Sequence, residues 1–275
     1  MKYKYSLLMV WCLLANISAF GQSRSVEVES FFQNGIQNLK NKQYSSAISN
    51  FSRVIQLDSK HEQGWLNLGV AKTALEQYRS AAGDFHNVLY INPNNLDAYL
   101  NRGICKFKLM AYDDAYADFR KAIELDGNNA KAHFYSGRTN LKLRKYQQAV
   151  SDLTTAQGLG YANYEVFLYK GNALARTKDY TSAINAFNKA LNYQPNSLEA
   201  TNNRGTAKLK TKDYAGALAD FDKVIQRQSS NKVAYYNRSI TLYNLQKFNR
   251  ACSDMRKSSN LGYKRATLRI REVCK

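Results

Sequence analysis

Apolar and small residues recur along this chain at fixed places in a frame of 34 residues. Four columns define the frame: a glycine, an aromatic residue nine positions later, an alanine three further on, and a large apolar residue four beyond that. The glycine column holds Gly35, Gly69, Gly103, Gly137, Gly171 and Gly205, followed by Ser239. The alanine column holds Ala47, Ala81, Ala115, Ala149, Ala183, Ala217 and Ala251, and the last column holds Phe51, Phe85, Phe119, Leu153, Phe187, Phe221 and Met255. No insertion interrupts the frame, so the chain is a tandem repeat.

The spacing within each repeat predicts two helices. A large residue four positions before the glycine, such as Trp65 or Phe167, lies on the same helix face as that glycine. The glycine and the alanine allow two helices to approach closely, so each repeat is predicted to be an antiparallel helix pair joined by a short turn. The two prolines, Pro93 and Pro195, both fall where the second helix must end.

These residues and spacings resemble the tetratricopeptide repeat over residues 28–263. The resemblance implies an all-α fold: an α-solenoid of seven helix-turn-helix repeats wound into a right-handed superhelix, whose first helices line a groove that holds peptides or protein segments. We expect repeats at 28–61, 62–95, 96–129, 130–163, 164–197, 198–231 and 232–263. Thr201 and Ser239 depart from the pattern and are expected to loosen the last repeats locally.

Two further segments flank the array. Residues 22–27 form a short N-terminal segment, and residues 264–275 carry apolar residues at helical spacing, which predicts a capping helix. Repeats 4 and 7 both end in Leu-Gly-Tyr, where Gly160 and Gly262 are expected to close a helix in the left-handed conformation.

The first residues have the pattern of a secretory signal. Lys2 and Lys4 precede an apolar run over residues 7–15 and a small-residue stretch, which predicts a signal peptide at 1–21 with cleavage before Gln22. The run is shorter than the roughly 20 residues that span a bilayer. Cys12 lies inside it and is interpreted as an unmodified signal-peptide residue. We therefore expect an exported protein that is periplasmic, associated with the outer envelope or secreted.

The charge narrows the class of partner. The formal net charge is +19, a balance that often indicates binding to nucleic acid phosphates. Export argues against nucleic acid, and the basic residues are spread along the chain without a dense block. Acidic proteins, anionic lipid headgroups and cell-wall polymers remain as counterparts.

The face of each first helix that points away from its partner helix carries the candidate binding residues. Basic residues recur five positions after the glycine, at Lys40, Lys108, Lys142, Arg176 and Lys210. Two positions before it stand Asn67, Asn101, Tyr135, Tyr169, Asn203 and Asn237, and Tyr236 lies beside the last of them. Amides and lysines together suit an extended acidic peptide. A solvated face whose basic residues satisfy helix-end carbonyls is the alternative, and the sequence leaves both open.

No residue pattern indicates catalysis or a cofactor. An aspartate stands fifteen positions after the glycine in five repeats, at Asp84, Asp118, Asp152, Asp220 and Asp254. Because this column repeats with the scaffold, we interpret it as polar contacts between helices, partly with Arg102, Arg204 and Arg238. The histidines occupy different repeat positions, so no metal site is expected. The protein is predicted not to be an enzyme.

Three cysteines follow the predicted signal peptide. Cys105 occupies a column of small residues and is expected in the core. Cys252, in the last repeat, and Cys274, in the cap, are close enough in the array to form a disulfide, which an oxidising compartment favours over free thiols.

Two functions remain. The first is a non-catalytic scaffold of the cell envelope that binds a protein or peptide segment in its groove. The alternative is a binding module for anionic glycan or cell-wall polymer.

Overall fold

A computed structural model of the chain describes residues 24–274. The predicted signal peptide and its Cys12 lie outside the described residues. Within them the protein is helical and contains no strand, as the repeat pattern predicts. No helix in this part of the chain is both long and apolar enough to cross a membrane.

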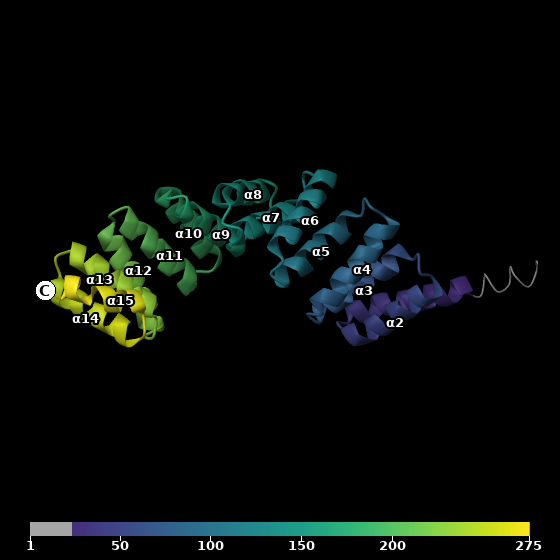
Figure 1. Ribbon diagram of the computed structural model, residues 1–275, viewed down its shortest axis with the longest axis horizontal. Helices are drawn as coiled ribbons and strands as arrows, with labels where there is room; N and C mark the ends of the chain where they lie inside the picture. The colour runs from purple at the N-terminus through teal and green to yellow at the C-terminus, as the bar shows by residue number, and fades with distance from the viewer. Residues whose placement is uncertain (1–23, 275) are drawn as a thin grey trace, which may run out of the picture. The chain divides into compact units, whose positions relative to one another are not determined.

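The helices alternate with short turns along the whole described chain (Figure 1). After a helix over residues 24–40 come α2 (Tyr44–Leu57), α3 (Glu62–Ala74), α4 (Tyr78–Ile91), α5 (Leu96–Lys108), α6 (Tyr112–Leu125), α7 (Ala130–Lys142), α8 (Tyr146–Gly158), α9 (Tyr164–Arg176), α10 (Tyr180–Tyr193), α11 (Leu198–Lys210), α12 (Tyr214–Arg227), α13 (Lys232–Asn244), α14 (Phe248–Asn260) and α15 (Lys264–Val273).

The chain divides into two compact units, Met1–Gly127 and Asn128–Lys275. In the first unit α3 packs on α4 and α5 on α6, and α4 also packs on α5. In the second unit the pairs are α7 with α8, α9 with α10, α11 with α12 and α13 with α14, with α15 packed on α14. Odd-numbered helices from α3 to α13 are the first helices of their repeats, and the even-numbered helices that follow them are the second helices.

In the repeats that have the glycine, the helix pair closes on a contact between this glycine and the large residue of the second helix. A Cβ atom placed on Gly103 would lie 2.6 Å from Cε1 of Phe119, and one on Gly171 would lie 2.6 Å from Cε1 of Phe187. Both rings are fully buried. Carbon atoms in contact prefer 3.5–4.0 Å, so only glycine fits against the ring.

The two departures from the pattern, Ser239 and Thr201, are both buried, and both hydroxyls have a hydrogen-bond acceptor. Ser239 is fully buried and faces Met255 in place of phenylalanine, and its hydroxyl donates to the Ala251 carbonyl oxygen at 2.8 Å. Thr201 is 1% exposed and its hydroxyl donates to the Ser197 carbonyl oxygen at 2.7 Å. Both hydroxyls satisfy their hydrogen bonds on the backbone, so burying them costs little.

Side-chain caps define where the first helices begin. An acceptor eight positions before the glycine takes a hydrogen bond from the backbone N–H three residues on, as in Asn129 Oδ1 with Ala132 at 2.9 Å. The same column caps α3, α5, α9, α11 and α13 through His61, Asn95, Asn163, Ser197 and Asn231. Such caps satisfy backbone donors that the helix itself leaves free.

The turn inside each repeat is left-handed although no glycine stands there. Residues seven positions after the glycine column, among them Met110 (φ 62°) and Lys178 (φ 67°), take positive φ. Gly160 and Gly262 also have positive φ, at 89° and 81°, which confirms the prediction for the ends of repeats 4 and 7.

Candidate functional site

The aspartate column forms interhelical polar contacts, which confirms the structural interpretation of these carboxylates. Arg102 on α5 donates through Nε and Nη2 to both oxygens of Asp118 on α6, at 3.0 and 2.6 Å, and Lys106 Nζ lies 2.8 Å from the same carboxylate. The Asp118 side chain is 5% exposed. We call the positions one before, three after and fifteen after the glycine the interhelical polar column.

The other repeats with an aspartate vary this arrangement. Lys72 pairs with Asp84, Arg204 and Lys208 with Asp220, and Arg238 with Asp254. In repeat 4 the partners are neutral: the Ser136 hydroxyl and the Asn140 amide donate to Asp152 at 2.7 and 2.8 Å. Each cation or amide neutralises or satisfies a carboxylate that would otherwise be costly between two packed helices.

Four of the candidate binding residues of the second unit, Tyr135, Tyr169, Asn203 and Asn237, lie between neighbouring first helices. Asn203 on α11 donates its amide to Asn172 Oδ1 on α9 at 2.9 Å, and Asn237 on α13 donates to the Thr206 hydroxyl on α11 at 3.1 Å. Both bonds join the residue two before one glycine to the residue one after the preceding glycine. Seven of the eight residues at these two positions from repeat 4 to repeat 7 have polar groups, the eighth being Ile240. We call these seven the polar seam: Tyr135, Arg138, Tyr169, Asn172, Asn203, Thr206 and Asn237.

At the repeat 4 end of the seam an arginine lies among aromatic rings. The Arg138 guanidinium carbon lies 4.8 Å from the centroid of the Tyr169 ring, 5.6 Å from that of Tyr135 and 5.3 Å from that of Phe134. Burial raises the pKa of the Tyr135 and Tyr169 hydroxyls, and the Arg138 charge acts in the opposite direction. Both tyrosines are therefore neutral donors and acceptors at physiological pH.

The sequence analysis names Tyr135, Tyr169, Asn203 and Asn237 as candidates, but it does not name Arg138, which lies beside the two tyrosine rings. The available signal was the column one after the glycine. In the first unit it holds Ile36, Val70 and Ile104, and in the second it holds Arg138, Asn172 and Thr206 before returning to Ile240. Asn67 and Asn101 of the first unit consequently have apolar residues in that column, and Asn67 donates to its own helix at the Gln63 carbonyl oxygen.

The predicted basic residues are exposed, and each is the last residue of its helix. Lys40 ends the helix over residues 24–40, Lys108 ends α5, and Lys142, Arg176 and Lys210 end α7, α9 and α11. Lys108 Nζ lies over the Tyr78 ring at 5.8 Å and Arg176 over the Tyr146 ring at 6.0 Å. Positive charge at a helix C-terminus is favoured by the helix dipole, so these positions have a structural reason independent of any ligand.

Tyr236 is mainly a packing residue. Its side chain is 9% exposed, its ring lies 5.1 Å from that of Tyr263, and its hydroxyl accepts from Arg269 Nη1 at 3.4 Å. The neighbouring-column residues Phe134 and Leu168 are also buried. These contacts place all three in the core beneath the first helices, so they offer a ligand little surface.

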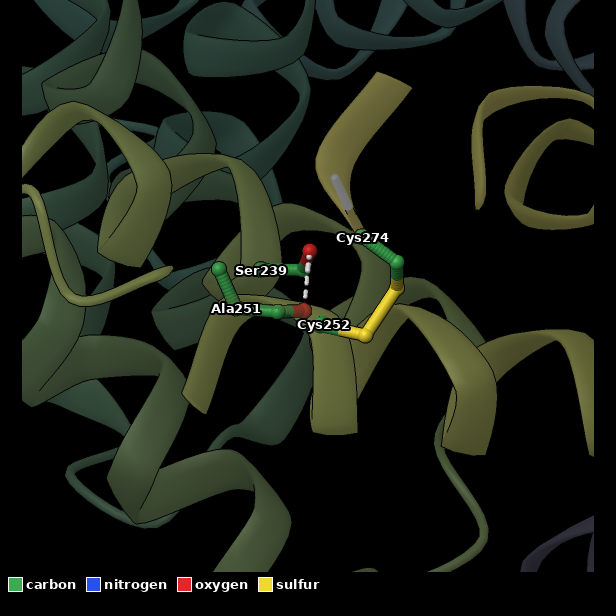
Figure 2. Close-up of a disulfide and its surroundings, with 4 residues drawn as sticks. All are labelled: Ser239, Ala251, Cys252 and Cys274. Atoms are coloured by element: carbon green, nitrogen blue, oxygen red, sulfur yellow. Dashed lines mark hydrogen bonds between the residues drawn. A yellow bond between two sulfur atoms is a disulfide. The ribbon is translucent and has the colours of Figure 1, made fainter. Parts of the chain in front are cut away.

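Cys252 and Cys274 are joined in the structure, across α14 and the end of α15 (Figure 2). Their Cα atoms lie 4.8 Å apart, within the range that disulfides occupy. Figure 2 shows the bond beside Ala251, whose carbonyl oxygen receives the Ser239 hydroxyl. Cys105 is fully buried, as predicted, with its Sγ 3.4 Å from the Thr73 hydroxyl.

Comparison with protein families agrees with this architecture. Residues 96–129 match one tetratricopeptide repeat family, and residues 136–197 and 170–233 match a second. The first match coincides with the helix pair α5–α6. The chain belongs to the tetratricopeptide repeat family. Tetratricopeptide arrays are in general protein-interaction modules without catalytic activity.

Solved tetratricopeptide structures share the fold at low sequence identity. A tetratricopeptide repeat protein from Parabacteroides merdae is 17% identical with a TM-score of 0.62, covering 90% of this chain and 97% of that one. Pseudomonas aeruginosa pilF is 20% identical with a TM-score of 0.62, over 77% and 97%. YrrB, described as a tetratricopeptide protein with an unusual peptide-binding site, is 21% identical with a TM-score of 0.60, over 65% and 92%. No curated protein sequence matches this chain.

Proposed function

We propose that this protein is an exported, non-catalytic scaffold of the cell envelope that binds an extended, acidic segment of a partner protein along the polar seam of its second unit. The observation that carries the proposal is the seam itself. It is a run of amides, hydroxyls and one arginine on successive first helices, with two of its contacts made between helices.

The chemistry of the seam suits a peptide backbone. Each asparagine amide has two N–H donors and an acceptor oxygen, and the Asn203–Asn172 bond uses one donor and one acceptor of that set. The remaining groups can pair with backbone C=O and N–H groups of an extended chain. Because the two amides already hold each other, less side-chain entropy is lost when a ligand binds.

The charge of the second unit suits an acidic partner. Arg138 lies within the seam, and Lys142, Arg176 and Lys210 end the three first helices that contribute to it. Exposed basic residues attract acidic segments over a distance of roughly 8 Å at physiological ionic strength. The peptide-binding site named for YrrB is consistent with this use of the fold.

A photo-crosslinking experiment tests the location. A benzophenone amino acid replaces Tyr169 in the seam or, as a control, Tyr90, which lies on a second helix of the first unit and is 86% exposed. After irradiation in the native envelope, we expect position 169 to give one protease-sensitive product that maps to a defined acidic segment. Products of equal yield from position 90 would contradict the proposal, and a protease-resistant product sensitive to glycan hydrolases would favour the alternative ligand.

Matched substitutions then test the seam amides. A peptide copy of the crosslinked segment is titrated against Asn203→Leu and against Asn101→Leu, which changes the same column in the first unit. The loss of one or two amide hydrogen bonds at about 1 kcal/mol each predicts about a five- to thirty-fold weaker Kd for Asn203→Leu. Asn101→Leu should bind as wild type does, and equal losses in both variants would exclude the seam as the site.

A further inference from the structure

Repeat 5 alone among the seven repeats keeps a cation in the interhelical polar column but lacks its carboxylate. Ala186 on α10 stands where Asp118, Asp152, Asp220 and Asp254 stand in other repeats. Lys170 on α9 stands at the position of Arg102, Arg204 and Arg238. Repeat 1 has asparagine at all three positions and therefore has no charge to neutralise.

A partly open pocket lies at this position. A pocket of about 260 Å³ lies between α8, α9 and α10 and is lined by Gln157, Lys170, Ser182, Asn185, Ala186 and Lys189, together with Phe167 and Leu174. This volume is several times the roughly 30 Å³ that one water molecule occupies in the liquid. It has room for a carboxylate group with a short aliphatic stem.

The two lysines of the pocket have no carboxylate partner in the described part of the chain. Lys170 Nζ donates one hydrogen bond, to Gln157 Oε1 at 3.1 Å, and Lys189 Nζ lies 5.6 Å from the centroid of the Phe167 ring. An ammonium group has three donors, so both lysines have donors left for a ligand. Burial, and then the charge of Lys189, lower the pKa of Lys170, the direction expected of an ammonium group with no carboxylate beside it.

We propose that this pocket binds a carboxylate anion supplied from outside the chain, which occupies the place that aspartate fills in the neighbouring repeats. Lys170 and Lys189 neutralise the carboxylate, while Asn185 and Ser182 add neutral donors. The carboxylate comes either from a small organic acid or from an acidic side chain of a bound protein. The site shares no residue with the polar seam, although its Lys170 lies on α9, the helix that also carries Tyr169 and Asn172 of the seam.

The first arm of the test uses acetate and succinate as probes. The melting temperature of the protein is measured against increasing acetate or succinate, with chloride at equal ionic strength as reference, and the Lys170 13Cε resonance is followed by NMR. We expect a saturable rise in melting temperature beyond that in chloride, and a higher pKa of Lys170 in saturating carboxylate. Identical behaviour in acetate, succinate and chloride, with an unmoved Lys170 resonance, would overturn the proposal.

The second arm restores the carboxylate within the chain. Ala186→Asp should raise the melting temperature without any ligand and abolish the acetate response, because its carboxylate fills the pocket. Lys170→Met should weaken carboxylate binding at least ten-fold. Thr181→Asp, which adds the same charge to α10 outside the pocket, should keep the full response. An Ala186→Asp protein that still responds to acetate as wild type does would show that acetate acts elsewhere.

Repeat 6 offers a gain-of-binding control. Asp220→Ala leaves Arg204 and Lys208 without their carboxylate, and we expect this variant to acquire a second, acetate-dependent rise in melting temperature. The source is distinguished by comparing N-acetylglutamate amide with N-acetylglutamine amide. Tighter binding of the glutamate compound than of acetate or succinate identifies an acidic side chain, and the reverse identifies a small organic acid. The Arg138→Gln variant of the seam should leave every one of these responses unchanged.

Discussion

The glycine column makes a quantitative claim about the core, which the pair Gly103 and Phe119 can test. In Gly103→Ser the new Cβ would lie 2.6 Å from Cε1 and 2.9 Å from Cδ1 of the buried Phe119 ring. Relief to a normal contact requires a shift of about 1 Å in a packed core, because carbon atoms prefer 3.5–4.0 Å. Overpacking of this kind costs about 1–3 kcal/mol.

The compensating change is already present in repeat 7. There serine faces Met255, both side chains are fully buried, and the serine hydroxyl donates to the Ala251 carbonyl oxygen. In Gly103→Ser with Phe119→Met, the flexible thioether can move off the new Cβ, and the hydroxyl can donate to the Ala115 carbonyl oxygen in the same way. We expect a favourable coupling free energy of about 1 kcal/mol or more between the two changes, as contacting residues commonly show.

Urea unfolding followed by circular dichroism measures the four corners of this cycle, and hydrogen exchange of α5 and α6 localises the change. Local exchange is needed because repeat arrays do not always unfold in one step. Strict additivity of the two single changes would refute the argument that the ring dictates the glycine.

Three further predictions concern other parts of the scaffold. Met110→Gly should stabilise the protein by about 0.5–1 kcal/mol in the same urea assay. A residue other than glycine costs roughly 1–2 kcal/mol in the left-handed conformation, and the greater chain entropy of glycine in the unfolded state offsets part of the stabilisation. A loss of stability would contradict this. Thiol labelling without reductant should leave Cys252 and Cys274 unmodified in protein from the envelope, and it should modify Cys105 only after unfolding. Reduction of the disulfide should lower the free energy of unfolding by roughly 3 kcal/mol for a loop of this size. Rapid labelling of all three cysteines would exclude the bond. Replacing the basic helix ends of the second unit, Lys142, Arg176 and Lys210, with glutamine should reduce the salt dependence of partner binding. Because each charge also stabilises its helix end, the change should lower the free energy of unfolding by about 0.3–1 kcal/mol per site. The same change at Lys40 and Lys108 should affect stability alone. An unchanged salt dependence of binding in the second-unit variant would exclude a role of these charges in attracting the partner.

The helix pairs could be predicted because the fold depends on the size of the residue at each column position, which can be read from the sequence. Glycine and alanine recur where helices touch, and phenylalanine recurs where space must be filled, so the columns report interhelical distance directly. The interpretation of Asp118 and its equivalents also held, since a residue that repeats with the scaffold contacts the scaffold. The local loosening expected at Ser239 stays a prediction. The large residue of the same repeat also differs from phenylalanine, since it is Met255, and both side chains are fully buried; a column considered alone does not show such a paired change.

The seam could be predicted only in part because its second half is not periodic. Arg138 stands in a column where four repeats have isoleucine or valine, and a residue type that appears once in a column gives no repeat signal. The role of Arg138 depends on the neighbouring first helix, α9, because the centroid of its Tyr169 ring lies 4.8 Å from the Arg138 guanidinium carbon. The basic helix ends present the opposite case, because Lys142 and Arg176 are periodic, and the helix dipole accounts for that periodicity without a ligand.

This contrast gives a physical criterion for function in a repeat protein. Packing requires the same kind of residue at a given column position in every repeat. A residue that binds a ligand must therefore differ from the other residues of its column, while the core of its own repeat stays intact. Repeat 5 satisfies both conditions. Gly171 still packs against the buried Phe187 ring, because a Cβ atom placed on it would lie 2.6 Å from Cε1, as at Gly103 in repeat 3. One position before Phe187, however, Ala186 stands where other repeats have aspartate. A repeat that was merely degenerating would be expected to lose its core contacts along with its ion pair. Repeat 5 lacks the carboxylate but keeps Lys170 of the interhelical polar column, and Lys189 lies in the same pocket, which is the change expected of a binding site.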